Sequence, residues 1–168
     1  MENNTFNQND MIKLQKLLRD NNKTITSAES CTGGLIAYNI TKVSGSSDIF
    51  NGAIVSYSNK IKNQELNVKK KTLEEFGAVS IEVVNEMLDG AINKFEADYA
   101  IAVSGIAGPN GGTKTKPVGT VVIGISSSNS HKNVEVYKFN GNREEVQKQS
   151  CNMGLNKIFK FLQKTLDK

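Results

Sequence analysis

The sequence predicts an α/β fold in which helices cover both faces of a mixed sheet. Helical and strand patterns alternate through the first half of the chain, as expected where helices connect parallel strands. In the second half, two strand patterns are separated by a short polar turn, which favours a local antiparallel pair. Helical patterns near both ends of the sequence supply further cover for such a sheet.

The first elements can be placed from their periodicity. A helix is expected at residues 11–19, where apolar side chains recur at helical spacing and Asn9 or Asp10 could cap the start. Residues 23–28 alternate as a short strand. A turn of small residues follows, and the apolar stretch at 35–40 then predicts a second helix.

The middle of the chain predicts another strand and a well-defined helix. Residues 51–58 have the composition of a strand, and a turn of helix is expected to follow from residue 59. Residues 80–95 place their apolar side chains on one helical face, with Ser80 as the expected N-cap and Gly77 breaking the structure before it.

The last third of the chain predicts three strands and a long helix. The apolar runs at 99–103 and 120–125 have the length of buried strands. Residues 134–139 alternate and are expected to pair with the run before them through the polar turn at 126–133. A final helix is expected at 143–166.

Length and hydropathy predict one cytoplasmic domain over residues 1–168. No stretch approaches the roughly 20 apolar residues that span a bilayer, so no membrane association is expected. Residues 1–10 are polar and lack the basic start and apolar middle of a secretory signal. A homodimer is expected from the general frequency of symmetric pairs.

Composition argues against several classes of function. Cys31 and Cys151 stand far apart, so reduced thiols are expected rather than a disulfide framework. One histidine, His131, is expected at the surface and offers little for a metal site, so no metal or other cofactor is expected. The net charge of +4 is modest, and the lysine run at 69–71 has the character of a solvated face. Nucleic-acid binding therefore has little support.

Small and hydroxyl residues at the first strand-to-helix junction form one candidate site. The residues are Ser30, Cys31, Thr32, Gly33 and Gly34. Unpaired N–H groups at such a junction can bind a phosphate or a developing oxyanion. The same residue types also make ordinary helix caps. Ser30 and Cys31 are both possible nucleophiles, although a cysteine would normally want a nearby histidine.

A second candidate lies at the end of the second strand, in the segment from Tyr57 to Lys62. A lysine can act as general base toward a serine if burial or a nearby positive charge keeps it neutral. Most lysines in loops are exposed and do not act as bases. Because the only histidine is poorly placed, a Ser-Lys pair is the hydrolytic chemistry that this composition most easily permits.

A glycine-rich loop forms the third candidate, from Ser104 to Gly112 and on to Thr120. It follows the carboxyl end of a strand, where open α/β sheets usually bind their ligands. Its glycine spacing fits neither a Walker loop nor a dinucleotide fingerprint, and a purely structural crossover is the alternative. Arg143, before the last helix, could hold a phosphate.

Seven ordered blocks resemble the CinA C-terminal domain family, and as a set they are far more specific than any one of them. They are Ala28-Glu29-Ser30-Cys31-Thr32-Gly33-Gly34, Gly45-Ser46-Ser47, Gly52, Tyr57-Ser58-Asn59, Gly77-Ala78-Val79-Ser80, Ser104-Gly105-Ile106-Ala107-Gly108-Pro109 and Lys116-Pro117-Val118-Gly119-Thr120. The resemblance implies a three-layer α/β/α sandwich. It also implies amidohydrolysis of nicotinamide mononucleotide to nicotinic acid mononucleotide and ammonia, in pyridine nucleotide salvage.

The same resemblance implies roles for individual residues. Ser30 would be the nucleophile, Lys62 its base and Tyr57 a neighbour that orients them; the family's lysine stands three residues beyond the asparagine, which selects Lys62 over Lys60. Substrate binding is expected from Cys31, Thr32, Gly33, Gly34, Ser46, Ser104, Gly105, Gly108, Lys116 and Arg143. Family members often carry a second arginine where this chain has Gln147. Longer members carry a nucleotide-processing domain ahead of this one, whose activity is not expected here.

The hypothesis that follows is acyl transfer through Ser30 with Lys62 as base. Its rival is a non-catalytic module that binds a nucleotide or a protein partner, in keeping with a family named after competence and DNA damage. The combination of Ser30, Tyr57 and Lys62 favours the enzyme, because a binding module has no need of it.

Overall fold

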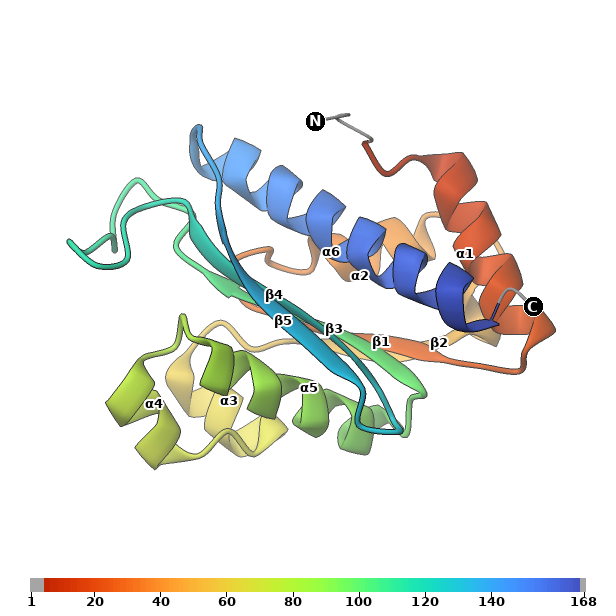
Figure 1. Cartoon of the computed structure of the whole chain (residues 1–168), viewed down its shortest axis with the longest axis horizontal. Coiled ribbons are helices and arrows are strands. Elements are labelled where there is room, and N and C mark those ends of the chain that lie inside the picture. The colour runs from red at the N-terminus through yellow and green to blue at the C-terminus, as the bar shows by residue number, and fades with distance from the viewer. Residues whose placement is uncertain (1–4, 167–168) are drawn as a thin grey trace.

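A five-stranded sheet lies at the centre of the computed structural model, which describes residues 5–166 (Figure 1). Its strands are β1 (Ile25–Glu29), β2 (Phe50–Val55), β3 (Tyr99–Gly105), β4 (Thr120–Ser127) and β5 (Lys132–Lys138). They lie in the order β2-β1-β3-β4-β5. β1 runs parallel to β2 and β3, whereas β4 runs antiparallel to β3 and β5. The mixed sheet confirms the predicted fold class.

Helices cover both faces of this sheet (Figure 1). One face carries α1 (Gln8–Asp20), α2 (Leu35–Thr41) and α6 (Arg143–Leu166), and the other carries α3 (Asn59–Leu66), α4 (Lys70–Phe76) and α5 (Ile81–Phe95). A short 3₁₀ turn, η1 (Ser46–Asp48), leads into β2. None of the helices in residues 5–166 has the length and apolarity needed to cross a bilayer.

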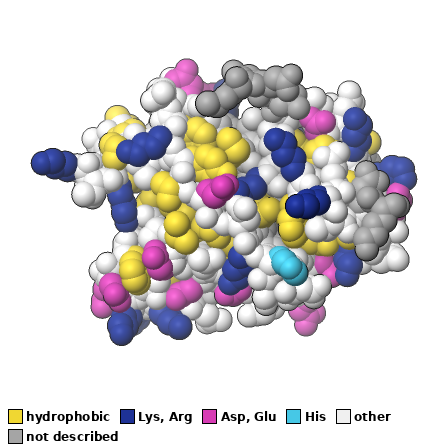
Figure 2. Space-filling view, in the orientation of Figure 1, with side chains coloured by type: hydrophobic (Ala, Val, Ile, Leu, Met, Phe, Trp, Pro, Cys, Tyr) yellow, Lys and Arg dark blue, Asp and Glu magenta, His cyan; other side chains and the backbone are white. Residues whose placement is uncertain are grey.

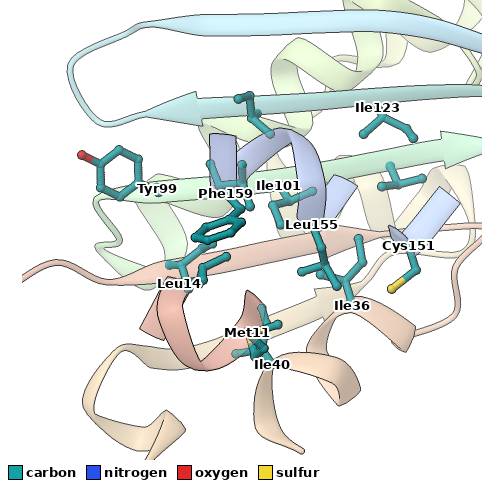
Figure 3. Close-up of a cluster of buried hydrophobic side chains, with 14 of the residues drawn as sticks. Met11, Leu14, Ile36, Ile40, Tyr99, Ile101, Ile123, Cys151, Leu155 and Phe159 are labelled. Carbon is teal, nitrogen blue, oxygen red and sulfur yellow. The ribbon is translucent and has the colours of Figure 1, made fainter. Parts of the chain in front are cut away.

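Two apolar cores separate the sheet from its helices. The larger lies beneath α1, α2 and α6, where Leu14, Ile36 and Leu155 meet Ile101 of β3 and Ile123 of β4 (Figure 3). The smaller joins α5 and the end of α3 to the opposite face of the sheet. β4 is buried along its whole length, which explains why its sequence forms a continuous apolar run. β1 is also fully buried, although its sequence alternates.

The edge strand β5 is much more exposed than the centre of the sheet. Figure 2 shows hydrophobic side chains across this face, interspersed with acidic and basic ones. Val136 is 52% exposed, and the charged side chain of Glu135 pairs with Lys157 of α6. Lysines at both ends of the strand, Lys132 and Lys138, disfavour pairing of this edge with another strand. His131, in the turn before β5, is exposed as expected.

Local capping decides where the predicted helices begin. α1 starts earlier than expected because Asn7 is its N-cap, and Asp10 completes a capping box with it. Neither Asn9 nor Asp10 is the cap. Ser80 caps α5 as predicted, accepting a hydrogen bond from the N–H of Val83 at 3.3 Å. α4 was not expected, because it buries none of its side chains completely and so leaves no apolar stripe in the sequence.

The parallel strands bring the segments that follow them to one edge of the sheet. The N–H of Ser30 donates to Val103 O at 3.0 Å, and that of Ser56 donates to Glu29 O at 2.7 Å, so the strand ladders continue beyond the carboxyl end of β1. The loop at residues 106–119 leaves the same edge after β3 and projects from the left of Figure 1. Three loops from distant parts of the sequence therefore meet there.

The contact of α5 with α3 predicts the effect of a glycine substitution. A Cβ at Gly90 would lie 2.1 Å from Leu66 O, so Gly90→Ala should lower the free energy of unfolding by about 2 kcal/mol, despite the ~1 kcal/mol that alanine gains in helix propensity. Gly154→Ala in α6 is the matched control, because its nearest contact is the Ile101 methyl at 3.2 Å. Urea denaturation measures both, and equal effects would contradict the prediction.

Candidate functional site

The segment that follows β1 turns sharply into α2. The N–H of Gly33 donates to Ser30 O at 3.0 Å and closes the turn. Gly33 and Gly34 have φ values of +61° and +97°, in the left-handed region that glycine adopts without steric cost. Ser30 is thereby held at the end of the sheet, at the start of a tight turn.

A buried carboxylate supports this turn from below. Glu29 is fully buried and accepts four hydrogen bonds within 3.0 Å. The donors are the hydroxyls of Ser27 and Thr32 and the N–H groups of Ile36 and Ala37. Because Gly34 provides no side-chain cap, Glu29 satisfies the first turn of α2 in its place. The sequence offered one indication of this role, an acidic residue directly before a turn that opens a helix.

The turn leaves backbone donors available for a ligand. Within residues 5–166, neither the N–H of Cys31 nor that of Thr32 donates to the backbone of another residue. Adjacent free N–H groups beside a hydroxyl nucleophile can stabilise a negatively charged oxygen. The arrangement has the elements of an oxyanion hole.

Lys62 reaches Ser30 from the opposite face of the sheet. It lies in α3, whose start is fixed by the Ser58 hydroxyl accepting from the N–H of Ile61. Its Nζ lies 3.0 Å from Ser30 Oγ and 2.7 Å from Ser56 O. The expected contact between the lysine and the serine is therefore present. Ser56, which the sequence did not indicate, supplies the second partner.

Burial changes the acid-base behaviour of Lys62. Its side chain is 1% exposed, and the loss of solvent lowers the pKa of its amine from 10.5 to about 8. Roughly a tenth of the molecules then carry a neutral amine at pH 7. This amine can accept a proton from Ser30 while an N–H still donates to Ser56 O.

Cys31 is a much weaker candidate nucleophile than Ser30. Burial raises the pKa of its thiol to about 12, so the reactive thiolate is essentially absent at neutral pH. The sulfur lies against the backbone of β3, where a Cβ on Gly105 would come within 3.0 Å of it. Of the two residues that the sequence left open, the geometry favours Ser30.

Arg143 and Tyr57 form the rim of the site. Arg143 is exposed at the start of α6, where Nη1 donates to Gly108 O at 2.7 Å and Nη2 donates to the Tyr57 hydroxyl. Tyr57 is 59% exposed. The Tyr57 hydroxyl is thus bonded to Arg143 and does not orient Lys62, as the resemblance had implied. Ser56 O orients the Lys62 amine instead.

These groups line a cavity of about 250 Å³. Of the residues expected at the site, it brings together Ser30, Cys31, Tyr57, Lys62, Ser104, Gly105, Gly108 and Arg143. The remaining lining residues were not expected as individual contacts, although each lies in a candidate segment or in a motif of the resemblance; they are Asn59, Ala78, Val79, Ile106, Ala107, Asn110 and Gly111. A larger open groove of about 630 Å³ lies between α3 and α4, but it contains neither Ser30 nor Lys62.

Five expected residues lie outside this cavity. Thr32, Gly33 and Gly34 line a separate hollow, formed with residues of α2 and α6. Ser46 precedes the amino end of β2, at the opposite edge of the sheet from Ser30, because it belongs to η1. Lys116 donates to Phe76 O at 2.7 Å and is held away from the cavity. Ser46 and Lys116 are therefore not placed to contact a ligand bound beside Ser30.

The donor set does not resemble a metal centre. Among residues 5–166, no three His, Cys, Asp or Glu side chains lie close enough to hold a metal ion. The cavity instead combines a hydroxyl, an amine and backbone N–H groups, which suits proton transfer and the binding of a polar carbonyl compound.

Comparison with known proteins identifies related sequences. Residues 8–162 match the sequence model of the CinA C-terminal domain family. A CinA-like protein of Prochlorococcus marinus strain MIT 9215 is 50% identical over 147 residues, covering 86% of this chain and 35% of the relative. One of Thermotoga neapolitana is 47% identical over 147 residues, covering 88% and 36%. The chain thus spans about a third of the length of these curated relatives.

Solved structures share the fold over nearly their whole length. Competence damage-inducible protein A of Klebsiella pneumoniae has a TM-score of 0.88 at 30% identity, covering 92% of this chain and 95% of that chain. A competence/damage inducible protein of Agrobacterium tumefaciens has a TM-score of 0.84 at 33% identity, covering 90% and 94%. The sheet and helices described above are therefore those of an existing structural family.

The lowered pKa of Lys62 predicts a specific dependence of stability on pH. Between pH 8 and 10.5 the unfolded chain holds a proton on this amine that the folded chain has released, so the free energy of unfolding rises with pH across that window. Relative to Lys62→Met, the wild type should gain about 2 kcal/mol between pH 7 and pH 10.

Denaturant unfolding at several pH values measures this difference. Lys60→Met is the matched control, because Lys60 is an exposed lysine of the same helix and should leave the curve of the wild type unchanged. Parallel curves for the wild type and Lys62→Met would show that the buried amine has an ordinary pKa.

Proposed function

Since this chain belongs to the CinA C-terminal domain family, we propose that it is a nicotinamide-nucleotide amidase, which hydrolyses nicotinamide mononucleotide to nicotinic acid mononucleotide and ammonia. The observation that carries the proposal is the 3.0 Å contact between Lys62 Nζ and Ser30 Oγ. A buried amine with a lowered pKa, placed beside a serine hydroxyl, is the minimal apparatus for serine amide hydrolysis.

The first half of the reaction acylates Ser30. Neutral Lys62 accepts the hydroxyl proton as Ser30 Oγ attacks the carboxamide carbon, and Ser56 O keeps the amine in place through its 2.7 Å hydrogen bond. The carbonyl oxygen becomes negative and accepts hydrogen bonds from the free N–H groups of Cys31 and Thr32. The lysine then returns the proton to the leaving nitrogen, and ammonia departs.

The second half releases the acid. Lys62, again neutral, removes a proton from a water molecule that attacks the acyl carbon, and the same N–H groups stabilise the second oxyanion. The proton passes to Ser30 Oγ as the ester bond breaks. One base thus serves both halves, as its position beside Ser30 requires.

The substrate itself favours the active form of the base. A pyridinium ring carries a fixed positive charge, which destabilises an ammonium group nearby. Burial already lowers the pKa of Lys62 to about 8, and the bound ring lowers it further. Substrate binding therefore increases the fraction of enzyme that can accept the serine proton.

The rim supplies the charge that a nucleotide phosphate needs. Arg143 stands exposed at the mouth of the cavity and is oriented by Gly108 O and the Tyr57 hydroxyl. A guanidinium fixed in this way can bind an anionic group from the solvent side. Lys116 lies outside the cavity and Gln147 is uncharged, so Arg143 is the principal candidate for this contact.

The setting of the activity follows from the same residues. Both cysteines are free and buried, in keeping with a reducing cytoplasm. We expect no cofactor, because the proposed steps need only a serine, an amine and backbone donors, and we expect the protein to act as a homodimer.

Ammonia release from nicotinamide mononucleotide by purified protein, without added metal, tests the activity. Ser30→Ala and Lys62→Ala should each lower the rate by several orders of magnitude, because a nucleophile and its base act together. Cys31→Ala and Lys60→Ala should retain most activity. No ammonia from the wild type at high enzyme concentration would favour the alternative of a binding module. An inactive Cys31→Ala beside an active Ser30→Ala would instead reassign the nucleophile.

The pH dependence of kcat/KM tests the role of the lysine. Because only the neutral amine accepts the proton, kcat/KM should rise about tenfold per pH unit below pH 8 and become level above it. Initial rates from about pH 6.5 to about pH 9.5 measure this limb, and Lys60→Ala should reproduce it. A rate that is independent of pH over this range would exclude Lys62 as the base.

A further inference from the structure

The glycine-rich loop after β3 has two limbs, and one of them forms a wall of the cavity. The inner limb, residues 106–112, supplies Ile106, Ala107, Gly108, Asn110 and Gly111 to that wall. The outer limb, residues 116–119, returns to β4. Hydrogen bonds join the limbs at the base of the loop, from the N–H of Gly119 to Ile106 O at 2.8 Å and from the N–H of Ile106 to Thr120 O at 2.9 Å.

The two limbs are also in close contact beyond this base. A Cβ added at Gly108 would lie 2.5 Å from Val118 Cγ1, and one added at Gly112 would lie 2.8 Å from Val118 N. The limbs are therefore too close at these positions for a side chain to fit between them. A displacement of Val118 in the outer limb is thus passed to the inner limb and to the cavity wall.

The outer limb is bonded to a distant part of the chain through Lys116. Its Nζ donates to Phe76 O at 2.7 Å, at the carboxyl end of α4 (Figure 1). The last carbonyl groups of a helix have no partner within the helix and interact favourably with a cation. Within residues 5–166, this is the one hydrogen bond that joins residues 109–116 to another part of the chain.

The acceptor of this bond belongs to the opposite wall of the cavity. Residues 78–79, which follow the end of α4, line the cavity. Their position is fixed from the sheet, because the Ser104 hydroxyl at the end of β3 donates to Ala78 O at 2.7 Å. Lys116 therefore connects one wall of the cavity to the other.

The other contacts of the loop fix the chain on either side of residues 109–116. Arg143 bonds to Gly108 O just before this segment, and the bonds at the base of the loop follow it. Within the segment, the N–H of Thr113 donates to Lys116 O and closes a local turn. Without the side-chain bond of Lys116, the segment would exchange between conformations. Only those that keep the wall in place would bind a ligand, which lowers the apparent affinity.

We propose that Lys116 is a positioning residue, which holds the glycine-rich loop to the end of α4 and so keeps Asn110 and Gly111 in the wall of the cavity. The inference rests on the proposed function, because the ligand whose binding it serves is the nicotinamide nucleotide. Lys116 acts through the loop and does not touch this ligand. Its loss weakens substrate binding and spares the chemical step, because Ser30 and Lys62 are unchanged.

Steady-state kinetics with nicotinamide mononucleotide test the inference. Lys116→Met removes the donor and keeps a long side chain. KM should rise about fivefold, because the competent conformation is less populated, while kcat changes less than about twofold. Lys116→Arg, which keeps a donor, should recover most of the wild-type KM. The pH at which kcat/KM becomes level should be the same in both variants.

Lys114→Met is the matched control. Lys114 is exposed in the same loop and makes no hydrogen bond or ion pair within residues 5–166. This variant should turn over the substrate as the wild type does. An unchanged KM in Lys116→Met, or a fall of kcat alone, would overturn the inference and leave the proposed amidase activity intact.

Limited digestion with trypsin tests the role of Lys116 without the substrate. Trypsin cleaves after lysine and arginine but not before proline, so the loop can be cut after Lys114, whereas residue 116 precedes Pro117. Cleavage after Lys114 should be about fivefold faster in Lys116→Met than in the wild type and in Lys116→Arg. Faster cleavage in a protein that releases no ammonia would reject the proposed function and retain the positioning of the loop. Equal cleavage rates would overturn the role of Lys116.

Discussion

The chemistry of the site depends on the burial of the Lys62 amine beside Ser30. Placing an ammonium group out of water is costly, and the protein offsets the cost with hydrogen bonds to Ser30 Oγ and Ser56 O rather than with a carboxylate. A carboxylate partner would stabilise the charged form and remove the lysine as a base. Burial is the dominant cause of the lowered pKa of Lys62, which agrees with this account.

The carboxylate nearest in sequence to the nucleophile does different work. Glu29 accepts three of its four hydrogen bonds from the start of α2 and the Thr32 hydroxyl, and the fourth from the Ser27 hydroxyl of β1. The negative charge is thus stabilised by the helix N-terminus. Glu29 therefore supports the turn, while the Lys62 amine bonds to uncharged oxygen atoms. From α6, Arg143 bonds to the glycine-rich loop and Gln147 bonds to the turn.

Sequence periodicity located most elements of the fold, because the buried faces leave apolar patterns that survive without tertiary information. α4 was missed since it packs with no side chain fully buried. The residues of the candidate site were likewise predicted only in part. Ser30 and Lys62 were expected from a hydroxyl-rich turn and a resemblance between motifs, whereas Ser46 belongs to a motif of the same resemblance and lies at the other edge of the sheet. A motif records which residues recur, and it does not record where they lie.

The sequence by itself determined the α/β class, the glycine-rich turn after β1 and the membership of an established family. Each of these depends on local patterns or on ordered motifs. Only the tertiary structure decided that Lys62 is buried and meets Ser30, and that Gln147 holds the Cys31 carbonyl. The physical reason is that burial and contact between residues 32 or 116 positions apart are set by how the helices pack on the sheet. No local pattern encodes that packing.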